Sequence, residues 1–330
     1  MSCIENINRY IVPNDVIKSL MNVYKYIGKN EIYSDVTKSN ISKIVEQTIQ
    51  RDAFFLGKIL NLDLTDTRLR LIITKNSQPR NREENVLFNL IEVLNDIQMH
   101  YDKYNIRSSD QYNMINYIYQ NQNIKFDTKE DGLFKNKSKR AYYDELSETL
   151  ISKSDQIDNI ILALNYFVDV YNLKPFTNQN KTSCLMSLYI LFLKADLNVF
   201  NYISFFELLY FNYNEFNDKL LDASYNWHDG ISQPTSFIRF MIKLILEAYG
   251  RADKIIKEYK IDQNLSKGDN IEHTINKLQN IFTKDQIRLI HPYVSESTIN
   301  RALQKLRDEN KIKPLGKGRS AKWIKTSNIF

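Results

Sequence analysis

The stretch KPFTNQNKTSCLMSLYILFLK, residues 174–194, joins a short polar loop to the most apolar segment of the chain. Residues 174–176 end an earlier helical pattern, and residues 177–181 are too polar to extend an apolar face. Residues 183–193 are hydrophobic nearly all round, which predicts a central buried helix. The loop therefore precedes the N-terminus of a buried helix, where free backbone N–H groups and the helix dipole favour a phosphate group.

The composition of the chain favours long helices over strands. Among 330 residues there are only eight glycines and six prolines, whereas turn-rich β architectures need many of both. The hydrophobic fraction of 43% and the charged fraction of 25% are ordinary for a globular protein. The predicted fold class is mainly α, with a length that suffices for one large core and a smaller module.

The sequence predicts a cytoplasmic protein without a membrane span. Residues 1–10 carry charges and lack the apolar core of a secretory signal. The longest apolar stretch, residues 184–193, is far shorter than the roughly 20 residues that cross a bilayer. Cys3 and Cys184 provide neither a disulfide framework nor a cysteine-type zinc site, and we expect no metal ligands of that kind.

Helical patterns follow one another along the chain. They predict helices over residues 14–26, 39–60, 85–104, 109–120, 155–173, 183–193, 202–210, 214–224 and 235–250. We expect Asn14 or Asp15 to cap the first helix, Gly28 to end it, and Ser154 to cap the helix over residues 155–173. In the segment 121–139, Asp131 and Gly132 permit a short β-hairpin, and the alternative is a solvated basic loop.

The polar loop resembles the active-site motif of the Fic proteins and of the related Doc toxins. Those motifs read His-Pro-Phe-x-Asp/Glu-Gly-Asn-Gly-Arg and His-x-Phe-x-Asp/Asn-Gly/Ala-Asn-Lys-Arg. The residues that match one or both versions are Pro175, Phe176, Asn178, Asn180 and Lys181. Lys174, Gln179 and Thr182 stand where the motif has its histidine, its small residue and its arginine. With the order of helices, the resemblance covers residues 85–259.

The resemblance implies a chemistry that these replacements impair. Fic enzymes transfer AMP from ATP to a hydroxyl of a target protein, with the histidine as general base, the acidic residue on magnesium and the arginine on phosphate. A lysine is ordinarily charged, so Lys174 is a poor base, and Asn178 lacks the charge that holds magnesium firmly. We expect AMP transfer to be lost or severely reduced. A separate hypothesis is that the chain still binds ATP with magnesium. The residues that would bind it are Phe176, Asn178, Asn180, Lys181 and Thr182.

A second resemblance concerns the end of the predicted helix over residues 39–60. Many Fic proteins carry an inhibitory helix with the motif Ser/Thr-x-x-x-Glu-Gly/Asn, whose glutamate pairs with the arginine of the loop. Ile59 and Asn61 match a wider version of that motif, whereas Leu60 replaces the glutamate. Leu60 and Thr182 stand at the two positions where the family has this glutamate and this arginine. Replacing both charged residues together avoids leaving one of them buried without its partner. The alternative is that Leu60 is an ordinary core residue.

The C-terminal residues resemble the winged-helix modules that often follow Fic domains. Apolar spacing predicts a helix over residues 271–281, Thr283 is expected to cap a second helix to residue 290, and Ser295 a third to residue 310. Short β segments, residues 311–315 and 321–325, flank a glycine-rich basic turn. Residues 301–330 hold nine Lys or Arg and only two Asp or Glu, so the net charge of +6 belongs to this end.

The third helix of this module carries residue types that read base edges or hold phosphates. Opposite its apolar face lie Ser297, Asn300, Arg301, Gln304 and Lys305, and the wing adds Lys317, Arg319 and Lys322. The predicted partner is duplex DNA. Dimerisation or protein docking through the module is the alternative.

The sequence therefore predicts three parts. These are an N-terminal helical region with the inhibitory-helix-like segment (1–84), a Fic-like domain (85–261) and a winged helix-turn-helix domain (270–330). We expect a DNA-binding or regulatory protein. One alternative is an active transferase that moves AMP or phosphate to a protein hydroxyl, and another is a scaffold that holds a partner protein in the substrate groove. The sequence also allows a homodimer.

Overall fold

Helices make up nearly all of the regular structure. The computed structural model describes residues 2–9, 11–75, 77–120, 122–128, 137–262, 267–291, 294–316 and 322–326. They divide into two compact units, residues 1–28 with 48–249 and residues 29–47 with 250–330. Two of the three boundaries fall within long helices, α3 (Ile41–Ile59) and α12 (Thr235–Asp262), and the third follows Gly28; the two units are described separately.

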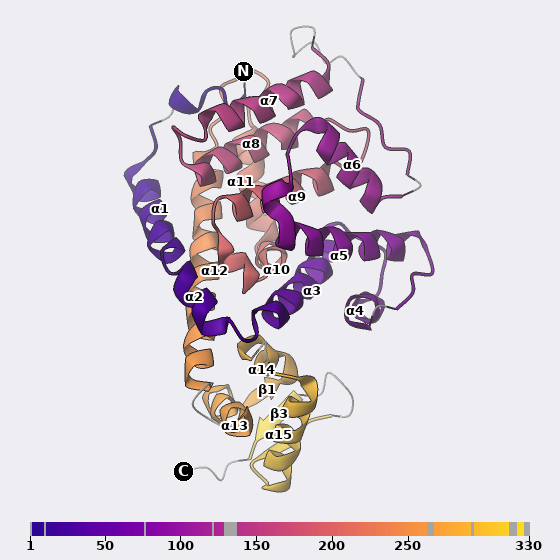
Figure 1. The fold of residues 1–330 in the computed structure, drawn as a ribbon, viewed down its shortest axis with the longest axis vertical. Helices are drawn as coiled ribbons and strands as arrows, with labels where there is room; N and C mark the ends of the chain where they lie inside the picture. The colour runs from indigo at the N-terminus through magenta and orange to yellow at the C-terminus, as the bar shows by residue number, and fades with distance from the viewer. Residues whose placement is uncertain are drawn as a thin grey trace. The chain divides into compact units, whose positions relative to one another are not determined.

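The first unit contains most of the helices (Figure 1). Besides parts of α3 and α12 these are α1 (Asn14–Ile27), α4 (Asp66–Lys75), α5 (Arg82–His100), α6 (Ser108–Ile118), α7 (Lys139–Lys153), α8 (Asn159–Leu173), α9 (Asn180–Lys194), α10 (Phe205–Phe211) and α11 (Tyr213–Ser224). Short 3₁₀ helices are η1 (Ile7–Arg9), η2 (Tyr101–Lys103) and η3 (Asn198–Asn201).

The core of this unit is built around α8 and α9. Every residue of α9 from Thr182 to Leu193 is buried, because the helix is apolar on all sides and must be covered all round. α8 packs along α9 and is itself covered by α7 and α11, while α6 covers another side of α9. The predicted central helix is thus confirmed, although it begins at Asn180 and not at residue 183.

A buried carboxylate joins α3 to the core. Asp52 accepts hydrogen bonds from the Ser204 hydroxyl at 2.6 Å, the Phe206 amide at 3.0 Å and the Tyr189 hydroxyl at 3.3 Å. These donors belong to the start of α10 and to α9, so one side chain links three helices. Burial raises the pKa of Asp52 to about 7.

A second buried carboxylate holds the N-terminal segment against α8. Asp169 accepts from the amides of Cys3 at 2.7 Å and Ile4 at 2.9 Å, and from the indole of Trp227 at 2.7 Å. Burial raises the pKa of Asp169 to about 6 despite these donors. These polar contacts hold α8, the helix that leads into the polar loop, against the N-terminal segment and Trp227.

Several predicted boundaries are wrong for identifiable reasons. Ser154 does not cap a helix that begins at residue 155; it ends α7, and α8 begins at Asn159, where Asp158 caps through the Ile161 amide at 2.9 Å. Pro13 occupies the cap position of α1, so neither Asn14 nor Asp15 does. α12 continues well past residue 250.

Three helices were not predicted at all. α2 (Asn30–Thr37) and α4 are short, and the buried side of α4 consists of Leu69, Ile72 and Ile73. The buried side of α7 includes Tyr142, Tyr143 and Ser147 as well as Leu146. The mixed buried side of α7 gives no clear apolar period in the sequence, because tyrosine and serine are not counted as core residues.

The second unit contains α2, the start of α3, the end of α12 and a small C-terminal module, residues 267–326. The module consists of α13 (Lys267–Lys277), β1 (Ile281–Thr283), α14 (Lys284–Ile290), α15 (Glu296–Asp308), β2 (Ile312–Pro314) and β3 (Lys322–Lys325). Its three strands are antiparallel in the order β1-β3-β2. This arrangement is consistent with the predicted winged helix. β1 corrects the prediction, which placed Ile281 in a helix.

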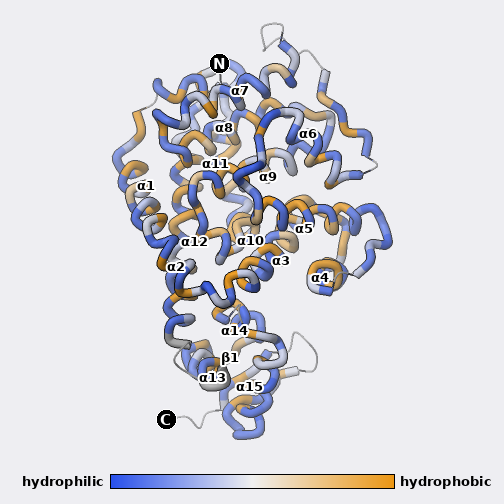
Figure 2. Tube along the Cα trace, in the orientation of Figure 1, coloured by the Kyte–Doolittle hydropathy of each residue, from blue (hydrophilic) through white to orange (hydrophobic). Residues whose placement is uncertain are grey.

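Local signals set the helices of the C-terminal module. Thr283 and Gln286 form a reciprocal capping box at the start of α14, and Ser295 caps α15 through the Thr298 amide, as predicted. The buried cluster includes Ile275, Phe282, Leu303 and Trp323. Figure 2 shows α15 as mostly hydrophilic with isolated hydrophobic positions, which is the pattern of a helix with one buried side.

No helix among the described residues has the length and apolar character that crossing a membrane requires.

Replacing Asp52 with Asn should make the free energy of unfolding depend less on pH. The folded state holds the Asp52 proton more tightly than the unfolded chain, so this carboxyl adds to the free energy of unfolding at pH 5 and the contribution is lost as the pH rises through about 7. We expect the wild type to lose roughly 2 kcal/mol more than the variant between pH 5 and pH 8 in urea denaturation. Asp63→Asn, an exposed position, is the control; equal losses in wild type and Asp52→Asn would contradict the assignment.

Candidate functional site

The polar loop between α8 and α9 is six residues long and turns sharply at both ends. Lys174 and Gln179 both lie in the left-handed region, with φ of 48° and 59°. Residues with a side chain adopt this region at a cost of about 1 kcal/mol each. The surrounding contacts must therefore hold the loop in place.

Asn180 supplies the main contact that closes the loop. Its side-chain oxygen accepts from the Phe176 amide at 2.9 Å, and its side-chain nitrogen donates to the Phe176 carbonyl at 2.7 Å. One amide thus satisfies both backbone groups of a residue four positions earlier. Both polar atoms of the Asn180 side chain therefore hold the loop in its shape.

A second segment pairs with the loop. The Thr177 amide donates to the Lys125 carbonyl and the Asp127 amide donates to the Pro175 carbonyl, both at 2.9 Å. The rings of Phe126 and Phe176 lie 5.3 Å apart at this antiparallel bridge. Of the predicted hairpin, residues 129–136 lie outside the described residues, so the hairpin stays a prediction. The part that is described covers one side of the loop.

Lys181 connects the loop to the end of α3. Its ammonium donates to the carbonyl of Ile59 at 2.5 Å and lies 4.8 Å from the ring centre of Tyr213. The C-terminal carbonyls of a helix carry partial negative charge, so a cation is well placed there. Next to this contact, Leu60 is half-buried and Asn61 adopts a φ of 54° that ends the helix.

Thr182 and Gln179 are also engaged within the protein. Thr182 is fully buried, and its hydroxyl is hydrogen-bonded to that of Tyr119 at 2.7 Å. Burial raises the pKa of Tyr119 to about 12, so this phenol stays neutral. Gln179 donates to the side-chain carbonyl of Gln122 at 3.0 Å. Thr182 thus belongs to the packed start of α9.

Lys174 and Asn178 are the exposed side chains at the two positions where the family motif has its base and its acid. Neither makes a side-chain hydrogen bond within the described part of the chain. The described loop hydrogen bonds involve no histidine, and His228 lies exposed beside Trp227. In the described ranges no group of three or more His, Cys, Asp or Glu residues could hold a metal ion.

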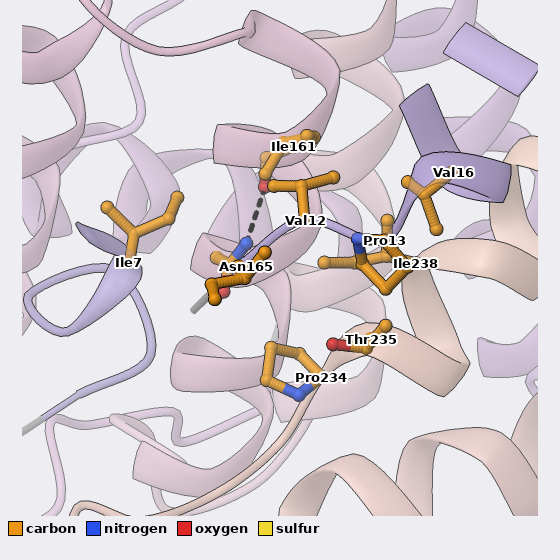
Figure 3. Close-up of a pocket in the computed structure, with 10 residues that line it drawn as sticks. Ile7, Val12, Pro13, Val16, Ile161, Asn165, Pro234, Thr235 and Ile238 are labelled. Atoms are coloured by element: carbon orange, nitrogen blue, oxygen red, sulfur yellow. Dashed lines mark hydrogen bonds between the residues drawn. The ribbon is translucent and has the colours of Figure 1, made fainter. Parts of the chain in front are cut away.

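A small hollow near the N-terminus offers no chemistry (Figure 3). It lies between Ile7, residues 11–16, α8 and the start of α12, and its lining includes Val12, Ile161, Asn165, Pro234 and Ile238. Asn165 donates to the carbonyl of Ile161 at 2.8 Å, as the dashed line shows. None of the lining residues is ionisable, so the hollow is not a candidate catalytic site.

The predicted DNA-binding residues of α15 lie on one exposed side. Ser297, Asn300, Arg301, Gln304 and Lys305 are exposed, opposite the buried Ile299, Leu303 and Leu306. Lys322 is exposed on β3, whereas Lys317 and Arg319 lie outside the described residues. Lys313 on β2, which the sequence did not single out, is exposed on the strand next to Lys322.

Comparison with known proteins identifies the fold. No family model and no curated protein matches the sequence. The structure is similar to the solved structure of a Fic family protein from Desulfovibrio desulfuricans G20, with a TM-score of 0.55 over 97% of this chain and 98% of that chain. The chain has the Fic fold. The sequence identity is only 13%, so the likeness establishes the Fic fold and leaves the activity to be argued from the site.

The role of Asn180 can be tested by removing its amide. Asn180→Ala leaves the Phe176 amide and carbonyl without partners, so we expect a loss of roughly 1 to 3 kcal/mol in the free energy of unfolding. Asn178→Ala, an exposed amide two residues earlier, should change it little. Chemical denaturation measures both variants, and similar losses would show that the two bonds to Phe176 do not hold the loop.

Proposed function

We propose that this chain is a Fic-like protein that does not transfer AMP and that binds duplex DNA through its C-terminal module. The observation that carries the proposal is the contrast between two surfaces. The side chains of Asn180, Lys181 and Thr182, which directly follow the loop, are engaged in contacts within the protein, whereas α15 presents an exposed polar and basic side.

The loop does not suit ATP with magnesium. To hold a phosphate, Lys181 would have to leave the Ile59 carbonyl, and Thr182 would have to leave a fully buried position. Asn180 would have to release both backbone groups of Phe176. The loop also contains no carboxylate to hold the metal ion and no histidine to take the proton of an attacking hydroxyl.

The C-terminal module suits a polyanion better. Among the described basic residues of the module, Arg301, Lys313 and Lys322 are exposed and make no ion pair within the described chain. Other basic residues are engaged: Lys311 pairs with Glu272 and Glu309, and Lys325 donates to the Asn276 and Leu278 carbonyls. Unengaged cations near an exposed helix are the electrostatic requirement for binding phosphates.

The absence of transfer can be checked with labelled ATP. Incubation of the chain with ATP labelled in the α- or γ-phosphate, magnesium and a cell lysate should add no label to any protein beyond that seen with the lysate alone. Label that appears with wild type and vanishes with Asn180→Ala would instead support the active transferase. Label on the α-phosphate would then indicate AMP transfer, and label on the γ-phosphate would indicate phosphate transfer.

DNA binding can be checked through its dependence on salt. The full chain should bind duplex DNA with an affinity that falls steeply as salt rises, and Lys322→Ala should weaken binding to all sequences and lower the salt slope by about one. Lys277→Ala is the matched control, because Lys277 is paired with Glu258 at 3.1 Å. Fluorescence anisotropy measures all three proteins; binding that ignores salt would contradict the proposal.

A further inference from the structure

The exposed side of α15 contains both engaged and free side chains. Ser297 is hydrogen-bonded to Ser295 at 2.9 Å, within the cap of the helix. Gln304 donates to both oxygens of Asp308, at 3.0 and 3.1 Å, and Lys305 lies 3.9 Å from Glu309. Each of these side chains would have to give up a contact in order to bind a ligand.

Asn300 and Arg301 differ from these neighbours. Both are exposed, and neither makes a side-chain hydrogen bond or ion pair within the described chain. They stand in the middle of the helix, one turn after Ser297 and one turn before Gln304. Their full hydrogen-bonding capacity is therefore available.

We infer that Asn300 and Arg301 are the pair that reads bases, with adenine opposite Asn300 and guanine opposite Arg301. The inference rests on the proposed binding of DNA. An asparagine amide offers one donor and one acceptor, which match N7 and N6 of adenine, and a guanidinium offers two parallel donors, which match O6 and N7 of guanine.

Their spacing limits where the two bases lie. Consecutive residues on a helix are 1.5 Å apart along its axis and about 100° apart around it, so their side chains reach neighbouring base pairs. The preferred site should therefore contain an adenine and a guanine in adjacent or nearly adjacent base pairs. Lys313 and Lys322, on the neighbouring strands β2 and β3, should hold phosphates and add no preference for sequence.

Selection from a random duplex library tests this assignment. The full chain at physiological salt should enrich sequences with the adenine and the guanine. Asn300→Ala should relax the preference at the adenine alone and Arg301→Ala at the guanine alone, each reducing discrimination by roughly ten- to a hundredfold. Gln304→Ala is the matched control on the same side of α15 and should keep the wild-type preference. Circular dichroism verifies that each variant is folded.

The possible failures are distinct. Salt-dependent binding without enrichment of adenine and guanine, or enrichment that both Asn300→Ala and Arg301→Ala retain, would overturn this assignment and leave the proposed DNA binding in place. Relaxation by Gln304→Ala instead would also overturn it, since its bonds to Asp308 would then not occupy that side chain. No binding to any duplex would overturn the proposed function as well.

Discussion

The first unit depends on the burial of α9. A helix that is apolar on every side has no surface to give to water, so neighbouring helices must surround it, as α6 and α8 do. Burial of this kind fixes where α9 begins and therefore where the loop before it lies. The position of the loop follows from the hydrophobic effect, and its chemistry is decided separately by a few polar side chains.

Three of those side chains, at the start of α9, make contacts within the protein around the loop. The free N–H groups at the start of a helix are general, but selectivity requires side chains that are available to a ligand. Asn180 closes the loop on itself, Lys181 is bound to a carbonyl at the end of α3, and Thr182 is packed against Tyr119. The same residue types that suggest phosphate binding in the sequence stabilise the fold in the structure.

The sequence predicted the parts of the structure where one signal dominates. The apolar run of α9, the caps Thr283 and Ser295, and the exposed side of α15 were all visible as local patterns. It missed α7 because tyrosines and a serine make up much of its buried side. It could not place Lys181 either. The partner is the backbone carbonyl of Ile59, 122 positions away, and since every residue has a backbone carbonyl, the sequence does not indicate which one is contacted.

The buried carboxyl of Asp52 couples folding to the solvent in one further way. Near pH 6 the folded protein keeps this proton and the unfolded chain does not, so unfolding releases it to the buffer. The heat measured by calorimetry then contains the ionisation heat of whichever buffer accepts the proton. The apparent enthalpy of unfolding should consequently differ between phosphate and an amine buffer at the same pH, even though the protein and its stability are the same.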